Sequence, residues 1–489
     1  MPAIITNKFR INNSEQFLES FTESSPNIYY LGIGKPQAHA TQTRGDSRTE
    51  NLGTETSPLT PPDSVSEEFY VFDDALAAKK ITSSDIQQVI PRRNWTTGTV
   101  YDMYRHDYGA FITGTSTTLT ANSGASSLFD ATFFVMSSAF NVYKCLDNNS
   151  NANSTVEPTG TSTSILTTAD GYKWKYMYTL SSSQQANFLS TDFMGVATNS
   201  TVASAAVDGA INIVKIKTAG SGGTNGTHTS VPIRGDGSSG TVTVTISSNA
   251  ISAVTVTNVG SGYTFGYIRV ADINTAGGGS LSGAELDCII EPKGGHGKNA
   301  IEELGGVFIM LNATFTGAEA ANSGDFTVSN DFRKLFLLRD PNSGGSAASA
   351  TTLRGTKAIR FKSSPTPGAF VVDEEINQTS TGAVGKIVEY DSTNRILYYI
   401  QTRFNDEGLD ANGNLTAFSG ENVVTGQTSS ATGTPDPDSD SAVNNVSFTN
   451  GYAPSEIDAD SGDIIYLESR TPISRASDQT ENVKLIVEF

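Results

Sequence analysis

Short apolar stretches separated by polar turns run through most of the chain. AIITNKF (3–9), NIYYLGIGKP (27–36) and YKWKYMYTLS (172–181) show the alternation and the aromatic or β-branched content that are typical of strands. TFFVMSSAFNVYKCLDN (132–148) and DFRKLFLLRDP (331–341) have the same character. The pattern therefore predicts a mainly β protein.

Helical spacing is confined to a few short segments. NNSEQFLESF (12–21) is predicted to be a short helix capped by Asn13 or Ser14. SSDIQQVIP (83–91) is predicted to form a helical turn that stops before Pro91. These helices are expected to decorate a β core and not to build it.

The segment DSVSEEFYVFDDALAAKKI (63–81) carries the clearest helix signal. Ser64 and Glu67 have the spacing of a capping box, in which each side chain bonds the backbone N–H of the other residue. Apolar residues follow at Phe69, Phe72 and Leu76. The pattern predicts a helix that begins after Ser64 and continues to about Leu76.

Near residue 200 the sequence becomes richer in glycine and poorer in charged residues, and it contains an internal repeat. INIVKIKTAGSGGT (211–224) and ISAVTVTNVGSGYT (251–264) share an apolar strand followed by Gly-Ser-Gly, forty residues apart. Charged residues become rare here. We expect 200–283 to be an inserted Gly-rich β module in which the two copies pair to bury their apolar faces.

A second β module is predicted over 355–435, where strand patterns alternate with glycine turns and end in a Ser/Thr/Gly run. The remaining segments are expected to form one core: 1–199 as its N-terminal part, 284–354 as a returning segment, and 436–489 as its C-terminal strands. The predicted architecture is a core built from both ends of the chain and interrupted by two modules.

Composition and charge narrow the functional classes. The chain has 489 residues, 46 glycines, 17 prolines and a net charge of −19, so it lacks the clustered positive charge that nucleic-acid binding requires. The start shows no apolar leader segment, and no apolar run is long enough for a membrane helix. Cys145 and Cys288 are expected to be buried free thiols.

Patterns that carry catalysis or metal binding are weak. The four histidines have no metal-ligand spacing, and no phosphate-binding loop or nucleophile elbow is present. DADSGD (458–463) lacks the closing Glu of a calcium loop and is interpreted as an acidic turn. GGHGKN (294–299) is interpreted as a tight turn with an exposed histidine, the alternative being a backbone anion site. We predict no enzyme activity, no metal and no cofactor.

One stretch, IPRRNW (90–95) with the tyrosines that follow, stands out from this background. Arginine, tryptophan and tyrosine are enriched in protein interfaces, and the arginine fork binds carboxylates. A second interpretation is that one arginine pairs with a carboxylate of the same chain and that the tryptophan is core. The interface candidates in this stretch are Arg92, Arg93, Trp95, Tyr101 and Tyr104.

VIPRRNW, VYKCLDN, DGYKWKYMYTLS and the terminal SGDIIYLESRTPISRASDQTENVKLIVEF together resemble the baseplate wedge subunit, the gene eight product, of T-even-type contractile-tailed phages. The likeness covers roughly 1–195 and 445–489. It implies a layered β-sandwich core with short helices in loops, a homodimer, and contacts with other wedge proteins. It implies a structural role in the virion tail baseplate. We expect assembly in the host cytoplasm, and from the net charge and the lack of a long apolar run we expect no nucleic-acid or membrane partner.

The polar link between the last two predicted strands adds four further interface candidates: Arg470, Arg475, Asp478 and Glu481. Glu468 or Glu481 is expected to pair with Arg92, Arg93 or Arg470; the alternative is a set of independent surface charges. A second functional hypothesis is a tail-associated carbohydrate-binding or receptor-contacting protein. Its candidate stacking residues are Tyr263, Phe265 and Tyr267.

Overall fold

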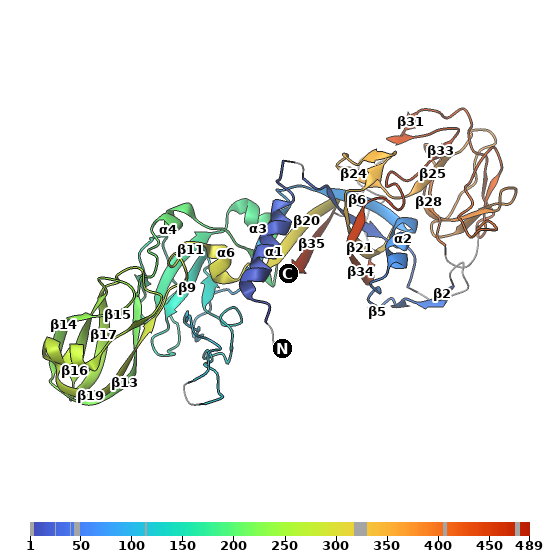
Figure 1. Ribbon diagram of the computed structural model, residues 1–489. Helices are drawn as coiled ribbons and strands as arrows, with labels where there is room; N and C mark the ends of the chain where they lie inside the picture. Colours follow the sequence, from blue (N-terminus) through green and yellow to red (C-terminus); the bar gives the residue numbers. More distant parts are fainter. Residues whose placement is uncertain are drawn as a thin grey trace. The chain divides into compact units, whose positions relative to one another are not determined.

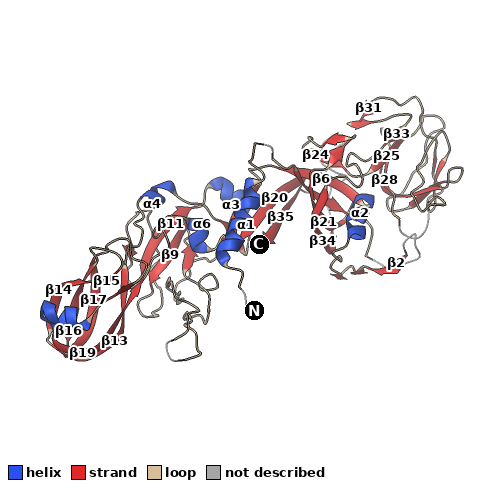
Figure 2. Ribbon diagram, in the orientation of Figure 1, coloured by secondary structure: helices blue, strands red, loops and turns tan. Residues whose placement is uncertain are grey.

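The computed structural model describes residues 4–24, 26–39, 41–43, 49–112, 115–316, 330–403, 408–474 and 480–489 (Figure 1). The prediction of a mainly β protein is confirmed: antiparallel sheets dominate, and the helices are few and short (Figure 2). The chain divides into two compact units. Unit 1 comprises Met1–Leu18, Gln87–Met310 and Ile486–Phe489, and unit 2 comprises Glu19–Ile86 and Leu311–Leu485.

Helix α1 (Asn7–Glu19) begins earlier than its sequence pattern indicates. The strand predicted over 3–9 is wrong, because Asn7 to Phe9 form the first turn of this helix. Ser14 is not an N-cap either. It lies buried in the middle of α1, where its hydroxyl donates to the carbonyl oxygens of Ile11 (2.7 Å) and Gly306 (2.9 Å).

The core of unit 1 is built on a four-stranded sheet of order β10-β11-β9-β8. These strands are β8 (Phe134–Met136), β9 (Asn141–Asp147), β10 (Leu166–Thr167) and β11 (Lys173–Thr179). The two aromatic-rich segments predicted as strands are therefore confirmed. Almost every residue of β9 and β11 is buried, which explains why these strands show continuous apolar runs instead of alternation.

The helical turn predicted over 83–91 is wrong, because Ile86–Pro91 form strand β7. It belongs to the sheet of order β12-β7-β20-β35, with β12 at Phe193–Gly195, β20 at Phe308–Thr316 and β35 at Thr480–Glu488. Gln88 is buried in β7 and donates to Ser14 Oγ (2.8 Å) and the Gly306 oxygen (3.2 Å). Because Gln88 is polar but buried, apolar and polar residues do not alternate along this strand. The spacing of its apolar residues therefore resembles that of a helix.

The Gly-rich segment folds around its own apolar core within unit 1, on two small sheets of order β13-β19-β18-β15 and β14-β16-β17. The two repeat copies lie in β13 and β17, one in each sheet. A backbone hydrogen bond from Ile211 N to Val259 O (2.9 Å) joins the two copies, and Gly223 N donates to Asn249 O (3.0 Å) just before the second copy. The strands are β13 (Ile213–Gly223), β14 (Gly226–Pro232), β15 (Arg234–Gly235), β16 (Thr241–Ser247), β17 (Ala250–Asn258), β18 (Gly266–Tyr267) and β19 (Gly279–Ile289).

Unit 2 contains a five-stranded antiparallel sheet of order β24-β6-β1-β21-β34. Helix α2 (Val65–Asp73) precedes it, and Ser64 caps α2 as predicted by accepting a hydrogen bond from Glu67 N. The predicted extension of α2 to Leu76 is wrong, because the chain turns at Asp74 and continues as β6. The strands are β1 (Tyr29–Gly34), β6 (Ala75–Ile81), β21 (Phe332–Arg339), β24 (Thr352–Arg354) and β34 (Asp463–Ile473).

A seven-stranded sheet of order β30-β29-β26-β27-β28-β25-β33 completes unit 2 and carries its own apolar core. Its strands are β25 (Lys357–Arg360), β26 (Glu375–Gln378), β27 (Ala383–Asp391), β28 (Ile396–Ile400), β29 (Val424–Gly426), β30 (Thr432–Gly433) and β33 (Tyr452–Ala453).

The remaining elements are short. They are the strands β2 (Thr41–Thr43), β3 (Thr49–Asn51), β4 (Gly53–Thr54), β5 (Ser57–Pro58), β22 (Asn342–Ser343), β23 (Ser346–Ala347), β31 (Ala442–Val443) and β32 (Val446–Ser447), and the helices α3 (Ser182–Phe188), α4 (Ser200–Ser204), α5 (Val270–Ile273) with a π-turn at Asn274–Gly278, and α6 (Ala300–Leu304).

Candidate interface residues and buried polar clusters

The two arginines of the IPRRNW stretch follow β7 and bond within their own unit. Arg92 donates from Nε to Asn94 Oδ1 (3.1 Å) and from a terminal nitrogen to the Ser190 oxygen (2.8 Å). Arg93 donates to the Ala131 and Phe129 carbonyl oxygens, and its guanidinium lies 4.5 Å from the centre of the Phe134 ring. Burial lowers the pKa of Arg93, although two nearby aspartates oppose the shift. Both arginines thus bond carbonyl groups of their own chain.

The aromatic residues of this stretch are packed into unit 1 to different depths. Trp95 is half-buried and donates from Nε1 to Ser154 Oγ (3.0 Å). Tyr101 is buried, and its ring meets the fully buried Trp174 edge-on at 5.9 Å. Of the two residues, Trp95 is the one with surface left for a partner.

Tyr104 contacts a group of buried polar side chains in unit 1. Its ring lies 5.0 Å from the Lys144 ammonium and 4.8 Å from the His296 ring. Lys144 comes from β9 and forms an ion pair with Glu303 of α6, both side chains being almost fully buried. The buried side chains of Glu291 and Lys175 complete the cluster. We call this group, Tyr104, Lys144, Lys175, Glu291, His296 and Glu303, the buried polar cluster.

The GGHGKN loop supplies its backbone N–H groups to this cluster. Gly297 N donates to both carboxylate oxygens of Glu303 (2.8 and 3.0 Å), and Asn299 N donates to one of them (3.1 Å). His296 N donates to Glu291 Oε2 (3.0 Å). The sequence-based alternative of a backbone anion site thus has a counterpart here, in which the anions are the chain's own carboxylates. The expected exposed histidine is wrong, since His296 is buried.

Burial shifts the pKa of two members of the cluster, Glu291 and His296, in opposite directions. Burial raises the pKa of Glu291 to about 7, against hydrogen bonds from Asn212 and His296 N and the charge of Lys144. Burial and the two lysines lower the pKa of His296 well below its usual value, so its ring is neutral. Its distances of 3.8 Å to Glu291 and 4.0 Å to Glu303 are therefore not ion pairs.

Sequence reasoning missed this cluster, although a signal was present. Lys144 and Lys175 lie in the middle of strands whose neighbours are aromatic and apolar, and a lysine is rarely buried without a partner. The partner, Glu303, is 159 residues away in sequence. The spacing of apolar and polar residues along the chain cannot identify a partner at that separation.

The remaining interface candidates belong to unit 2 or lie outside the described residues. The carbonyl oxygen of Arg470, in β34, is 2.9 Å from Nε2 of the buried His39. Glu481, in β35, is buried. Arg475 and Asp478 fall in 475–479, outside the described residues. The structure thus brings Arg92, Arg93, Trp95, Tyr101 and Tyr104 into one unit and assigns Arg470 and Glu481 to the other.

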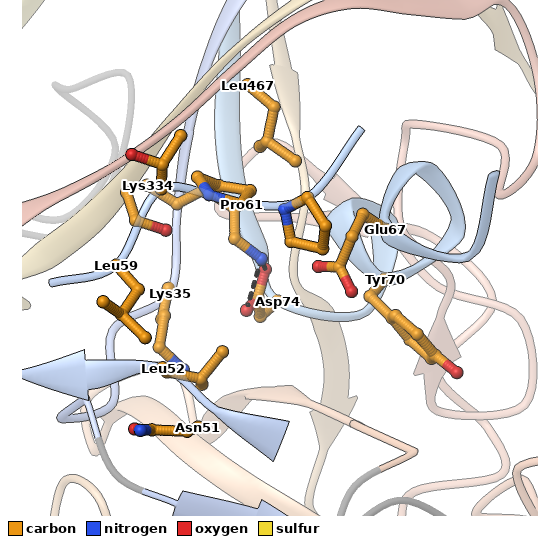
Figure 3. Close-up of a pocket in the computed structure, with 13 residues that line it drawn as sticks. Lys35, Asn51, Leu52, Leu59, Pro61, Glu67, Tyr70, Asp74, Lys334 and Leu467 are labelled. Atoms are coloured by element: carbon orange, nitrogen blue, oxygen red, sulfur yellow. Dashed lines mark hydrogen bonds and ion pairs between the residues drawn. The ribbon is translucent and has the colours of Figure 1, made fainter. Parts of the chain in front are cut away.

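A small pocket in unit 2 lies beside α2 (Figure 3). At one side Lys334 Nζ is bonded to both carboxylate oxygens of Asp74 (2.9 and 3.0 Å). Leucine and proline side chains from 52–62 line another side, and Glu67, Tyr70 and Leu467 are among the other lining residues. Its volume of about 40 Å³ accommodates a few water molecules and no substrate. The pocket therefore contains a satisfied ion pair.

The acidic turn interpreted from DADSGD is held by neutral and cationic partners. Asp458 accepts hydrogen bonds from Gly344 N (3.0 Å) and Gly345 N (2.7 Å), and Asp463 pairs with Arg339 (2.5 Å). In the described ranges no three acidic, histidine or cysteine side chains gather in a metal-binding arrangement. No helix in that part of the chain is long and apolar enough to cross a membrane.

The aromatic residues considered for sugar stacking differ in exposure. Tyr263 is buried, and its hydroxyl donates to the Ile233 oxygen (3.1 Å) and accepts from Gly240 N (3.1 Å). Phe265 and Tyr267 are exposed by 54% and 43%. Only the latter two are available to a ligand.

The fold is mainly β, and the polar side chains described above bond largely within their own chain. The family model described as Bacteriophage T4, Gp8 matches residues 3–155 and 389–489, slightly more than half of the chain, so the chain belongs to this family of baseplate wedge proteins. It is a structural component of a phage tail baseplate. No match was found among curated proteins.

Proposed function

We propose that this subunit holds neighbouring wedge proteins together during assembly of a contractile tail. The observation that carries the proposal is the family match at both ends of the chain. The buried polar cluster and the Lys334–Asp74 pair support it, because bonded interior charges favour one rigid arrangement of the strands around them. A rigid subunit is what a mechanical assembly requires.

We further propose a homodimer with the IPRRNW stretch at or near the contact between copies. Arg92 and Trp95 are half-buried and close in sequence. Arginine and tryptophan are among the residues that contribute most binding energy when a partner covers them. Tyr101 and Tyr104 support the stretch from inside unit 1. Arg475 and Asp478 stay candidates for contacts with a wedge partner.

Light scattering of the purified chain tests this proposal. Arg92→Glu is expected to turn a dimer into a folded monomer, whereas the exposed Lys217→Glu, a charge reversal of the same size, leaves the dimer intact. A dimer that persists in Arg92→Glu would reject this self-contact and direct attention to another wedge protein. Loss of folding in circular dichroism would assign Arg92 to its own core.

A receptor-contacting, carbohydrate-binding role is the second candidate. The exposed neighbours Phe265 and Tyr267 favour it, since aromatic rings provide stacking surfaces. Glycan-array binding that is lost in Phe265→Ala/Tyr267→Ala would support this role. An unchanged array signal would refute these two residues as the contact.

A further inference from the structure

A groove in unit 2, at the end of the β27–β28 hairpin, has the features of a ligand site. It has a volume of about 380 Å³, within the range of small-molecule pockets. One wall is the irregular segment 363–369, and the other is the hairpin turn with Tyr390, Ser392 and Arg395. Residues 363–369 lie outside the part of the chain that the family model matches.

Arg395 is held in place with part of its guanidinium free. Its backbone oxygen accepts from Phe361 N (2.9 Å), and its Nε donates to the Phe361 oxygen (3.2 Å). Within the described ranges the two terminal nitrogens have no hydrogen-bond partner, and no carboxylate forms an ion pair with Arg395. Arg395 thus borders the groove without an ion pair in the described ranges.

The backbone at Arg395 is unfavourable for arginine. Its φ of 58° is in the left-handed region, which favours Gly or Asn and costs other residues about 1 kcal/mol. The Nε bond to the Phe361 oxygen uses one end of the guanidinium and leaves its two terminal nitrogens beside the groove. The chain thus places an arginine beside the groove in spite of this backbone cost.

Tyr390 forms a fixed aromatic surface beside the arginine. Its ring meets Phe370 edge-on at 5.2 Å, and Phe370 in turn stacks on Phe361 at 5.4 Å. An aromatic ring fixed in this way can pack against the apolar face of a ligand without losing side-chain freedom on binding.

Of the other six lining residues, three carry hydroxyl groups, and Pro367, Gly368 and Ala369 add an apolar surface. Ser363, Thr366 and Ser392 are exposed, and their hydroxyls bond no described residue. Segment 363–369 has no strand edge, so it offers no backbone ladder to an extended peptide. Hydroxyls, a fixed ring and one arginine fork instead match a polyhydroxylated molecule that carries a carboxylate.

We propose that this groove binds an acidic sugar, with Arg395 on the sugar carboxylate, Tyr390 against the ring, and the three hydroxyl side chains on the sugar hydroxyls. The proposal does not depend on the wedge role, because it concerns a single chain. It gives the second candidate function a defined location away from Phe265 and Tyr267.

The test is calorimetric titration of the full chain with short oligosaccharides that bear uronic or ulosonic carboxylates, beside neutral oligosaccharides of the same length and oligoglutamate. Arg395→Asn is the main variant, because asparagine tolerates the left-handed backbone and the fold is expected to survive. Arg339→Gln, at a half-buried arginine outside the groove whose partner Asp463 is exposed, is the control.

We expect the wild type and Arg339→Gln to bind at least one acidic oligosaccharide, and Arg395→Asn to bind it at least tenfold more weakly. Tyr390→Leu should also weaken binding, while Arg395→Lys should retain part of it. Three results would each overturn the proposal: no acidic sugar binds, neutral sugars bind equally well, or Arg395→Asn binds like the wild type. Equal binding of oligoglutamate would identify an acidic peptide as the occupant instead.

Discussion

At the scale of single residues, Glu291 is an acid whose burial makes folding depend on pH. Its folded pKa of about 7 lies above its ordinary value of 4.5, so the folded state holds the proton more tightly than the unfolded state. The stabilisation is fully present below about pH 4.5 and is lost as the pH rises through 7. The neutral amide of glutamine retains a similar shape without this titration.

In the wild type, the free energy of unfolding should fall between pH 5 and pH 8 as Glu291 loses its proton. We predict that this fall is about 2–3 kcal/mol smaller in Glu291→Gln. Urea unfolding at several pH values measures this difference directly. Asp73, whose pKa burial raises to about 6, titrates in both proteins and cancels in the comparison. Parallel pH profiles for the two proteins would show that Glu291 is already ionised in the fold.

In the ion pair of Lys144 and Glu303, we predict that removing the glutamate destabilises the protein more than removing the lysine. Glu303→Leu removes the partner of a buried ammonium and leaves the Gly297 and Asn299 N–H groups without their acceptor. Its expected cost is about 3–5 kcal/mol. Lys144→Met should cost less, because Glu303 keeps those N–H donors.

Urea midpoints of the two variants test that order. Lys217→Met is the control, since its partner Glu285 is exposed and such pairs contribute about 0–1 kcal/mol. Equal losses for Glu303→Leu and Lys144→Met would mean that the loop N–H groups contribute nothing to the carboxylate.

At the scale of elements, the packing of β1 against β21 depends on a glycine in one strand that lies opposite an aromatic ring in the other. Gly32 pairs with Phe336, and the Phe336 ring occupies the space that a Cβ at position 32 would need. Glycine normally weakens a strand, so its presence in the centre of a buried sheet is explained by this packing.

Gly32→Ala is therefore predicted to destabilise the protein by about 1–3 kcal/mol through overpacking. In a double-mutant cycle, Phe336→Leu should cost less in the Gly32→Ala background than in the wild type, because the smaller side chain makes room. Thermal or urea unfolding of the four proteins measures the coupling. Additive losses would place the clash elsewhere.

The elements also show what local sequence can predict. β9, β11, β21 and the Ser64 cap of α2 follow from patterns within a few residues, and they were predicted. β7 was not, because its buried Gln88 has partners in α1 and before β20, at sequence separations of 74 and 218 residues. For the same reason the buried polar cluster was missed, and the exposed histidine expected at position 296 was wrong.

At the scale of the whole molecule, the chain enters and leaves the segment 213–289 of unit 1 through neighbouring strands. β13 and β19 leave and return as an antiparallel pair, with Ile216 opposite Leu286. Two ion pairs stand near the ends of the segment, which we call its base: Lys215 with Asp147 (2.9 Å) and Arg105 with Asp287 (2.6 Å). The apolar core beyond the base is separate from the main core of unit 1.

Excision of 217–285, with an Asn-Gly turn joining Ile216 to Leu286, should therefore leave a folded protein. Val214 and Cys288, which the module covers, are changed to Thr and Ser to limit new apolar surface. Circular dichroism is expected to show a cooperative transition for the remainder, because both base ion pairs are retained.

The excised chain then tests whether the module contributes to the baseplate. If it enlarges the baseplate or contacts a neighbouring tail protein, phage that carry the excised chain should assemble fewer stable particles, and full-length chain supplied in trans should restore them. Because the excised chain stays folded, the loss would be a lost contact and not a misfolded subunit. Unchanged wedge assembly, particle stability and infectivity would refute a contact role for the module while leaving the role of the core strands intact.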